Sequence, residues 1–126
     1  MPQGCTETDC TRRSIAWVLW GVPAAALLLG SLVAPVPRML LWTPAFAVAG
    51  VACVVNAAHC GRLHCYITGP LYLLAAVATV LAGTDLVPLR WSWIGCAVIG
   101  GTILAYVPEW VWVKYVVPAG ARAQAS

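Results

Sequence analysis

The chain has 126 residues, of which 62% are hydrophobic and 9% are charged, with a formal net charge of +3. An ordinary soluble domain has about 25% charged residues, so this chain has too few ionic side chains to cover a water-soluble globule. The composition therefore excludes a soluble monomer, a disordered tail and a strongly charged nucleic-acid-binding protein. It predicts one compact unit whose main solvent and partner is the lipid bilayer.

Four apolar stretches are separated by short polar breaks. They are Ser14–Val33, Met39–Ala58, Tyr66–Ala82 and Trp91–Val107, and the last can continue to Val113. A membrane-crossing helix needs about 20 apolar residues, within a range of roughly 17–25. The stretches are continuously apolar, which favours helices over the alternating strands of a barrel. We therefore expect an all-α integral membrane protein, a bundle of four transmembrane helices that forms a single domain over residues 1–126.

Two residue patterns add detail to these stretches. All seven tryptophans lie near predicted ends, where indole rings settle at the level of the lipid headgroups. Small residues recur at every fourth position in three stretches, which predicts close contacts between helices. The three sets are Ala26, Gly30 and Ala34; Ala75, Thr79 and Gly83; and Ala97, Gly101 and Ala105.

Lysine and arginine predict the orientation in the membrane. Arg38 and Arg90 lie in the first and third loops, and five other basic residues lie on the opposite side of the predicted bilayer. Because cytoplasmic segments are enriched in Lys and Arg, both termini are expected in the cytoplasm of a multi-pass plasma or inner membrane protein. The cytoplasmic tails are then residues 1–13 and 118–126. The first stretch exceeds the usual core of a signal peptide, about 7–15 residues, and is expected to remain as a helix.

Cysteine and histidine are the most reactive side chains of the chain, with six and two copies. The second predicted loop contains His59, Cys60, His64 and Cys65, and the amino-terminal segment contains Cys5 and Cys10. Two membrane crossings separate these segments, so they are expected on the same face of the membrane. Thiolate and imidazole are ligands that favour Cu(I), Zn(II) and related ions.

The second apolar stretch extends this group into the bilayer. Cys53, Asn56 and Cys60 are spaced to share one helix face, and a helical turn in the loop would align Cys60 with His64. Cys96 fits a small, buried hydrophobic side chain near the opposite membrane face. The predicted metal ligands are thus Cys5, Cys10, Cys53, His59, Cys60, His64 and Cys65.

Two further positions near this face have competing interpretations. Glu109 could complete the site or accept a proton, but a solvated position at the helix end, paired with Lys114, is favoured. Thr68 is expected to cap the third helix, with Gly69 and Pro70 shaping its start.

In its architecture the chain resembles the small bacterial mercuric-ion transport membrane proteins. The resemblance covers the four stretches, the cytoplasmic cysteines and Cys53 within the bilayer. It implies a short helical bundle that passes Hg(II) inward through cysteine pairs. The vicinal cysteine pair of that family is absent from Ser14–Val33, so the resemblance carries over no ligand.

The leading hypothesis is a protein that binds or transports a soft metal ion, Hg(II), Cu(I) or Zn(II), through the Cys and His residues named above. Two alternatives stay open: a membrane thiol–disulfide oxidoreductase, and a non-catalytic subunit or assembly factor of a homo-oligomer or larger membrane complex. The sequence contains no nucleophile–base motif, phosphate-binding loop or metalloprotease helix, which favours a non-enzymatic role.

Overall fold

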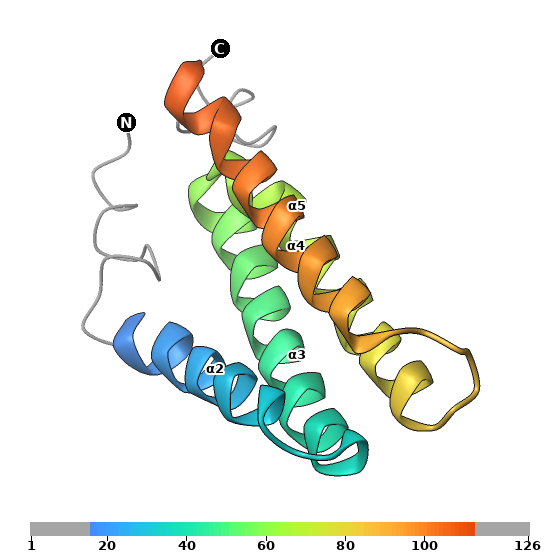
Figure 1. Ribbon diagram of the computed structural model, residues 1–126. Helices are drawn as coiled ribbons and strands as arrows, with labels where there is room; N and C mark the ends of the chain where they lie inside the picture. Colours follow the sequence, from blue (N-terminus) through green and yellow to red (C-terminus); the bar gives the residue numbers. More distant parts are fainter. Residues whose placement is uncertain (1–15, 113–126) are drawn as a thin grey trace.

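The computed structural model describes residues 16–112 of the chain. This part forms four helices and no strand, which confirms the all-α prediction (Figure 1). The helices are α2 (Ala16–Ser31), α3 (Pro35–Cys60), α4 (Leu63–Gly83) and α5 (Trp91–Val111). Three of them, α3, α4 and α5, are long and apolar enough to cross a membrane, whereas α2 is shorter, with 16 described residues.

The helix ends differ from the predicted limits, most of all around the second loop. Helix α3 begins at Pro35, because proline is pre-organised for the first helical position. It ends at Cys60, where Gly61 adopts a left-handed conformation with φ 66° and donates its N–H to the Ala57 carbonyl. Helix α4 then begins at Leu63. The prediction of a loop from residue 59 to residue 65 is therefore wrong, since only Gly61 and Arg62 connect the helices.

The four helices pack in chain order. Helix α2 contacts α3, α3 contacts α4, and α4 contacts α5. In Figure 1, α3, α4 and α5 run side by side, and α2 is inclined to them. Within residues 16–112 the backbones of α2 and α5 do not meet, so the four helices form an open row.

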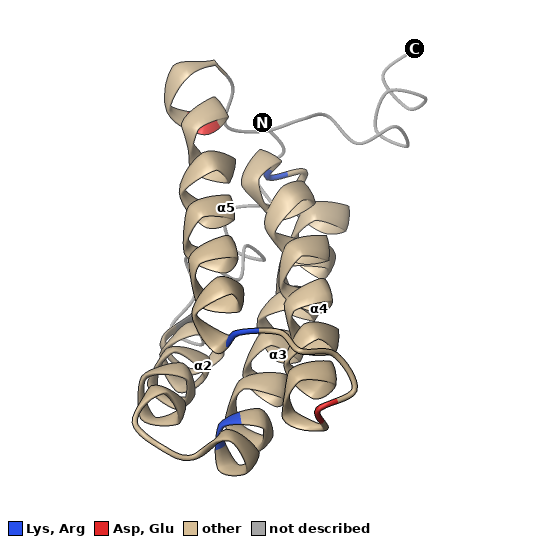
Figure 2. Ribbon diagram, turned by 45° about the vertical axis from the view of Figure 1, so that its right-hand side comes forward, with Lys and Arg blue, Asp and Glu red and all other residues tan. Residues whose placement is uncertain are grey.

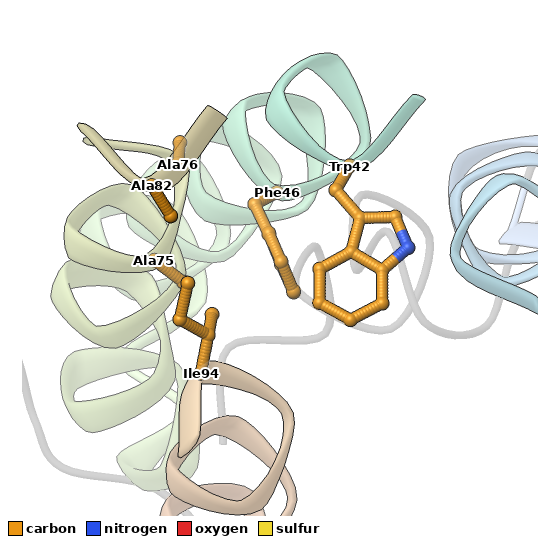
Figure 3. Packing of buried hydrophobic residues seen from close by; sticks show 6 residues of the cluster. All are labelled: Trp42, Phe46, Ala75, Ala76, Ala82 and Ile94. Carbon is orange, nitrogen blue, oxygen red and sulfur yellow. The ribbon is translucent and has the colours of Figure 1, made fainter. Parts of the chain in front are cut away.

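The larger apolar cluster lies near the connection between α4 and α5. Figure 3 shows Trp42 and Phe46 extending from α3, with three alanines of α4 and Ile94 of α5 in the same cluster. The Trp42 ring also meets Trp91 edge-on, with ring centroids 5.7 Å apart. Trp42 is only 8% exposed, and its indole Nε1 donates to the Leu27 carbonyl over 3.0 Å. Trp42, expected near the end of an apolar stretch, thus packs between the helices, and its indole N–H has a hydrogen-bond partner there.

Small residues make the contacts between α3 and α4. On α4, Ala75 and Thr79 are buried, and a side chain at Gly83 would collide with Met39 of α3. The Thr79 hydroxyl donates to the Ala76 carbonyl and accepts a hydrogen bond from Thr43 of α3 over 2.8 Å. The predicted contact stripe on this helix is confirmed.

Charged residues lie only at helix ends and connections within the described part of the chain (Figure 2). Arg38 is in the first turn of α3, Glu109 is in the last turn of α5, and the other three are in connections. The uncharged central turns of α3, α4 and α5 expose large aliphatic side chains, such as Leu74 at 68% and Leu104 at 70%.

Candidate functional site

A cluster of reactive side chains lies at the end of the row where α3 ends, α4 begins and α5 ends. Helix α3 contributes Cys53, the first turn of α4 contributes His64 and Cys65, and the last turn of α5 contributes Glu109. We call these four residues the thiol site. The exposed fractions of Cys53, His64 and Cys65 are 1%, 2% and 0%, so the site is closed to solvent.

The two-residue connection explains how Cys65 returns to Cys53. The left-handed Gly61 reverses the chain, so α4 runs back along α3. Gly69 then allows the two helices to approach closely. A Cβ at this position would lie 2.8 Å from Cγ2 of Val54 and 3.6 Å from Cβ of Cys53. Gly69 therefore lies inside α4 and permits the close contact with α3. The prediction that it shapes the start of the helix is wrong.

The two thiols of the site are in direct contact. The Cys53 and Cys65 side chains interact with each other and form a buried cluster with Ala57. Trp20 of α2 and Tyr72 of α4 pack against this cluster. Neither cysteine is in a disulfide. The structure thus pairs two thiols that are twelve positions apart in the sequence.

Each thiol lies within hydrogen-bond distance of a buried polar side chain. The Thr68 hydroxyl lies 3.4 Å from Sγ of Cys53, and Nδ2 of Asn56 donates to Sγ of Cys65 over 3.5 Å. Thr68 also lies 2.9 Å from the His64 carbonyl one turn earlier. Thr68 is inside α4, so the prediction that it caps this helix is wrong.

Glu109 contacts the first turn of α4. Its Oε1 accepts hydrogen bonds from the backbone N–H of His64 over 3.2 Å and from the ring at Nδ1 over 2.7 Å. An acidic group is favourable there because helix N-terminal amides lack partners and the helix dipole is positive. The side chain of Glu109 is only 4% exposed. The favoured interpretation of Glu109 as a solvated residue is therefore wrong, since α5 continues to Val111 and brings it onto α4. Lys114 lies outside the described residues.

His64 joins Glu109 to the thiol of Cys65. With its Nδ1–H donated to Glu109, Nε2 is the acceptor that faces Sγ of Cys65, at 3.3 Å. The ring is held in place by stacking on Tyr106 of α5, with centroids 4.3 Å apart and planes 18° apart. An acid that orients a histidine, which in turn contacts a thiol, is the arrangement that activates a cysteine as a nucleophile.

The structure brings together three of the seven predicted ligands, Cys53, His64 and Cys65. His59 is exposed at the end of α3. The helix breaks at Gly61, so the continuous helical turn that would have aligned Cys60 with His64 does not form. The side chain of Cys60 is outside the described set, as are Cys5 and Cys10. Cys96 is exposed on α5 and not buried as expected.

Among the side chains that the structure describes, no group of three or more His, Cys, Asp and Glu has an arrangement that could hold a metal ion. These side chains therefore do not form a four-ligand zinc site. The thiol pair remains as a two-ligand arrangement.

Sequence reasoning missed Tyr106, expected Thr68 to cap the helix, and weighed a role at the site for Glu109 without favouring it. Their types carry no distinctive spacing, and only a helix contact between α4 and α5 brings Tyr106 and Glu109 to His64. Asn56 was the one signal available, as a polar residue in an apolar stretch. Trp20, which packs on the thiol pair, has a buried Nε1 with no acceptor among the described residues.

No protein-family model, curated protein or solved structure matches this chain. Its function therefore has to be argued from the chemistry of the thiol site and from the surface that surrounds it. The surface is mainly apolar, and the site combines two thiols with a histidine–carboxylate pair.

Proposed function

We propose that this protein is an integral membrane protein in which the described helices cross or enter the bilayer. The support is an arrangement with apolar side chains outside and polar ones inside. The fully buried side chains include Asn56, Thr68 and Thr79, whereas leucines and valines cover the outer faces of the helices. In lipid, polar groups turn inward and small residues make the helix contacts, as they do between α3 and α4.

We further propose that both termini and the Gly61–Arg62 connection face the cytoplasm. The bias of Lys and Arg supports this orientation. Fusing a reporter that is active only in the cytoplasm to the carboxyl terminus tests it, with a second fusion in the α4–α5 connection after Asp85. Activity of the carboxyl-terminal fusion alone is expected, and activity of the second fusion alone would overturn the orientation.

The function that the geometry supports best is binding and transport of a soft metal ion at the Cys53–Cys65 pair. The observation that carries this proposal is the contact of two buried thiols between α3 and α4. Thiolates select soft ions such as Cu(I), and two sulfur ligands suffice for an ion with linear coordination. This chemistry favours Cu(I) or Hg(II) over Zn(II), which takes four ligands in structural sites.

Loading a thiol pair with a metal ion displaces its protons. His64 Nε2, 3.3 Å from Cys65 Sγ and backed by Glu109, is placed to receive one of them. The site also lies near the two-residue connection between α3 and α4, at one end of the row of helices. Transport then consists of thiolate exchange at the buried pair.

A variant that keeps only this pair gives the sharpest test. In C5S/C10S/C60S/C96S, Cys53 and Cys65 are the only cysteines that remain. We expect the purified, chelator-stripped variant to bind one Cu(I) or Hg(II) per chain with two sulfur neighbours by X-ray absorption. C53S and C65S are expected to lose this ion. Equal binding by C53S/C65S and by the wild type would overturn the proposal.

Transport is measured separately in cells. Cells that express the wild type should take up more Hg(II) or Cu(I) than cells that express C53S/C65S at the same membrane level. Equal uptake would reject transport, whereas equal binding in the purified protein would reject the metal site itself.

The alternative of thiol–disulfide exchange with other proteins has less support. Cys53 and Cys65 are 1% and 0% exposed, so a protein disulfide cannot reach either sulfur in this structure. Exchange requires attack of a thiolate on an accessible disulfide sulfur.

A further inference from the structure

The groups around the Cys65 sulfur include more than a metal ion would require. Three groups surround its sulfur: Asn56 Nδ2 at 3.5 Å, His64 Nε2 at 3.3 Å and the thiol of Cys53. A metal ion needs only the two sulfurs. The histidine with its orienting carboxylate is instead what a reactive cysteine requires, namely a base within hydrogen-bond reach. A second thiol in contact with the first is what a resolving cysteine requires.

We propose that Cys53 and Cys65 form a peroxide-reactive dithiol, in which Cys65 attacks hydrogen peroxide and Cys53 then closes an intramolecular disulfide. This activity uses the same thiols as the proposed metal site but needs no metal. The two are mutually exclusive, because a disulfide leaves no thiolate for an ion.

The reaction balances with the groups at hand. The Cys65 sulfur gives up its proton to His64 Nε2 and attacks one peroxide oxygen, which breaks the O–O bond and forms a sulfenic acid. The leaving hydroxide takes the proton from His64 and departs as water. The Cys53 sulfur then attacks the Cys65 sulfur, and the sulfenic hydroxyl leaves with the Cys53 proton as a second water. Two thiols are thus oxidised to one disulfide, and one peroxide is reduced to two waters.

Burial determines the class of oxidant. Both sulfurs are closed to solvent and lie against apolar side chains, among them Ala57 and Tyr72. A bulky charged disulfide such as oxidised glutathione cannot approach either sulfur, whereas a small uncharged peroxide can diffuse through lipid and between packed helices. The amide N–H of Asn56 donates to the Cys65 sulfur and is placed to stabilise charge on it during the reaction.

The test uses chelator-stripped protein in detergent, so its result does not depend on the metal proposal. The variant C5S/C10S/C60S/C96S is treated with hydrogen peroxide, and the remaining thiols are alkylated and counted by intact mass. We expect loss of both alkylatable thiols, a Cys53–Cys65 linkage in a non-reducing peptide map, and full recovery with dithiothreitol. Oxidised glutathione should leave both thiols intact over the same time.

Four variants test the roles of the individual groups. In C53S, Cys65 should accumulate a sulfenic acid that dimedone traps. H64Q should slow oxidation at least about tenfold, since general-base assistance is worth more than that. E109Q, which leaves His64 itself unsubstituted, covers the case in which H64Q does not fold. The proposal would be overturned if the Cys53–Cys65 linkage did not form, or if the wild type and E109Q were oxidised at equal rates. It would also be overturned if dimedone labelled Cys53 in C65S but did not label Cys65 in C53S.

Discussion

Oε1 of Glu109 lies 2.7 Å from Nδ1 of His64, although 45 residues separate them along the chain. This contact joins the end of α5 to the start of α4 inside an otherwise apolar environment. It also replaces a local cap, since Arg62 at the N-cap position of α4 makes no side-chain capping bond. One carboxylate thus both completes a helix end and orients the imidazole next to Cys65.

Removing this carboxylate should destabilise the protein measurably. Truncation of one partner of a buried pair leaves the other unsatisfied and costs about 3 kcal/mol. We therefore expect E109A to lower the free energy of unfolding by about this amount, and E109Q to lower it less because the amide oxygen still accepts a hydrogen bond. Unfolding in detergent, followed by circular dichroism, measures both.

The matched control for Glu109 is Asp85, an exposed acid in the connection between α4 and α5. Its φ of 55° is a conformation that asparagine also tolerates, so D85N should leave stability unchanged. A loss in D85N as large as in E109A would show that net charge, and not the contact with His64, is responsible.

Gly69 offers a test of the contact between α3 and α4. A methyl group at this position would lie 2.8 Å from Cγ2 of Val54, in a helix pair with no space to spare. G69A should destabilise the protein by about 1–3 kcal/mol through overpacking, and it should slow formation of the Cys53–Cys65 disulfide by moving the helices apart.

Gly95 of α5 is the control for this substitution. A Cβ there meets no atom within 4 Å, and Ala exceeds Gly in helix propensity by about 1 kcal/mol. G95A should therefore be neutral or slightly stabilising. The proposed close approach would be contradicted by equal melting temperatures of G69A and G95A.

Arg38 ties the end of α2 to α3 and α5. Its Nε donates to the Gly30 carbonyl over 2.9 Å, and its Nη2 donates to the carbonyls of Ser31 and Val33. The guanidinium also lies 5.4 Å from the ring centroid of Trp91. Hydrogen bonds from a charged donor are worth about 2 kcal/mol each in net stability. R38Q should therefore loosen α2, measured as faster proteolysis in the connection before α3.

We expect that lysine cannot perform the role of Arg38, because a single ammonium group cannot reproduce the planar guanidinium that donates to several carbonyls. R38K should accordingly be cleaved almost as fast as R38Q. Arg90 is exposed, and R90K serves as the control with wild-type cleavage. Wild-type resistance of R38K would show that charge alone holds α2.

The hydroxyls of Tyr72 and Thr102 link α4 to α5. Thr102 lies 2.7 Å from the Val98 carbonyl and donates there, so the Tyr72 hydroxyl is the donor in their 3.0 Å contact. Y72F keeps the ring in the core and removes only this bond. In a double-mutant cycle with T102V, we expect a coupling energy of about 0.6 kcal/mol, typical of hydrogen bonds between membrane helices. Additive single effects would show that the contact contributes nothing.

Hydropathy was sufficient to predict the helical class and the number of apolar segments. Lipid demands continuous apolar surface and internally satisfied backbone, and these demands are visible in a linear pattern. The limits of the helices were less predictable. In a hydropathy profile, polar residues such as His59 and His64 are indistinguishable from loop residues, yet both lie inside helices. His59 is exposed in the last turn of α3, whereas His64 is buried in the first turn of α4.

The thiol site, in contrast, required the tertiary structure. Cys53 and Cys65 meet because a two-residue connection and the small surface of Gly69 fix the register of α3 against α4. Glu109 is buried because α5 runs one turn past its apolar stretch and ends over the free amides of α4. Charge scarcity drew attention to cysteine and histidine, and the structure places three of them, Cys53, His64 and Cys65, in one buried cluster. Which of them act together depends on long-range helix packing, and no local spacing encodes it.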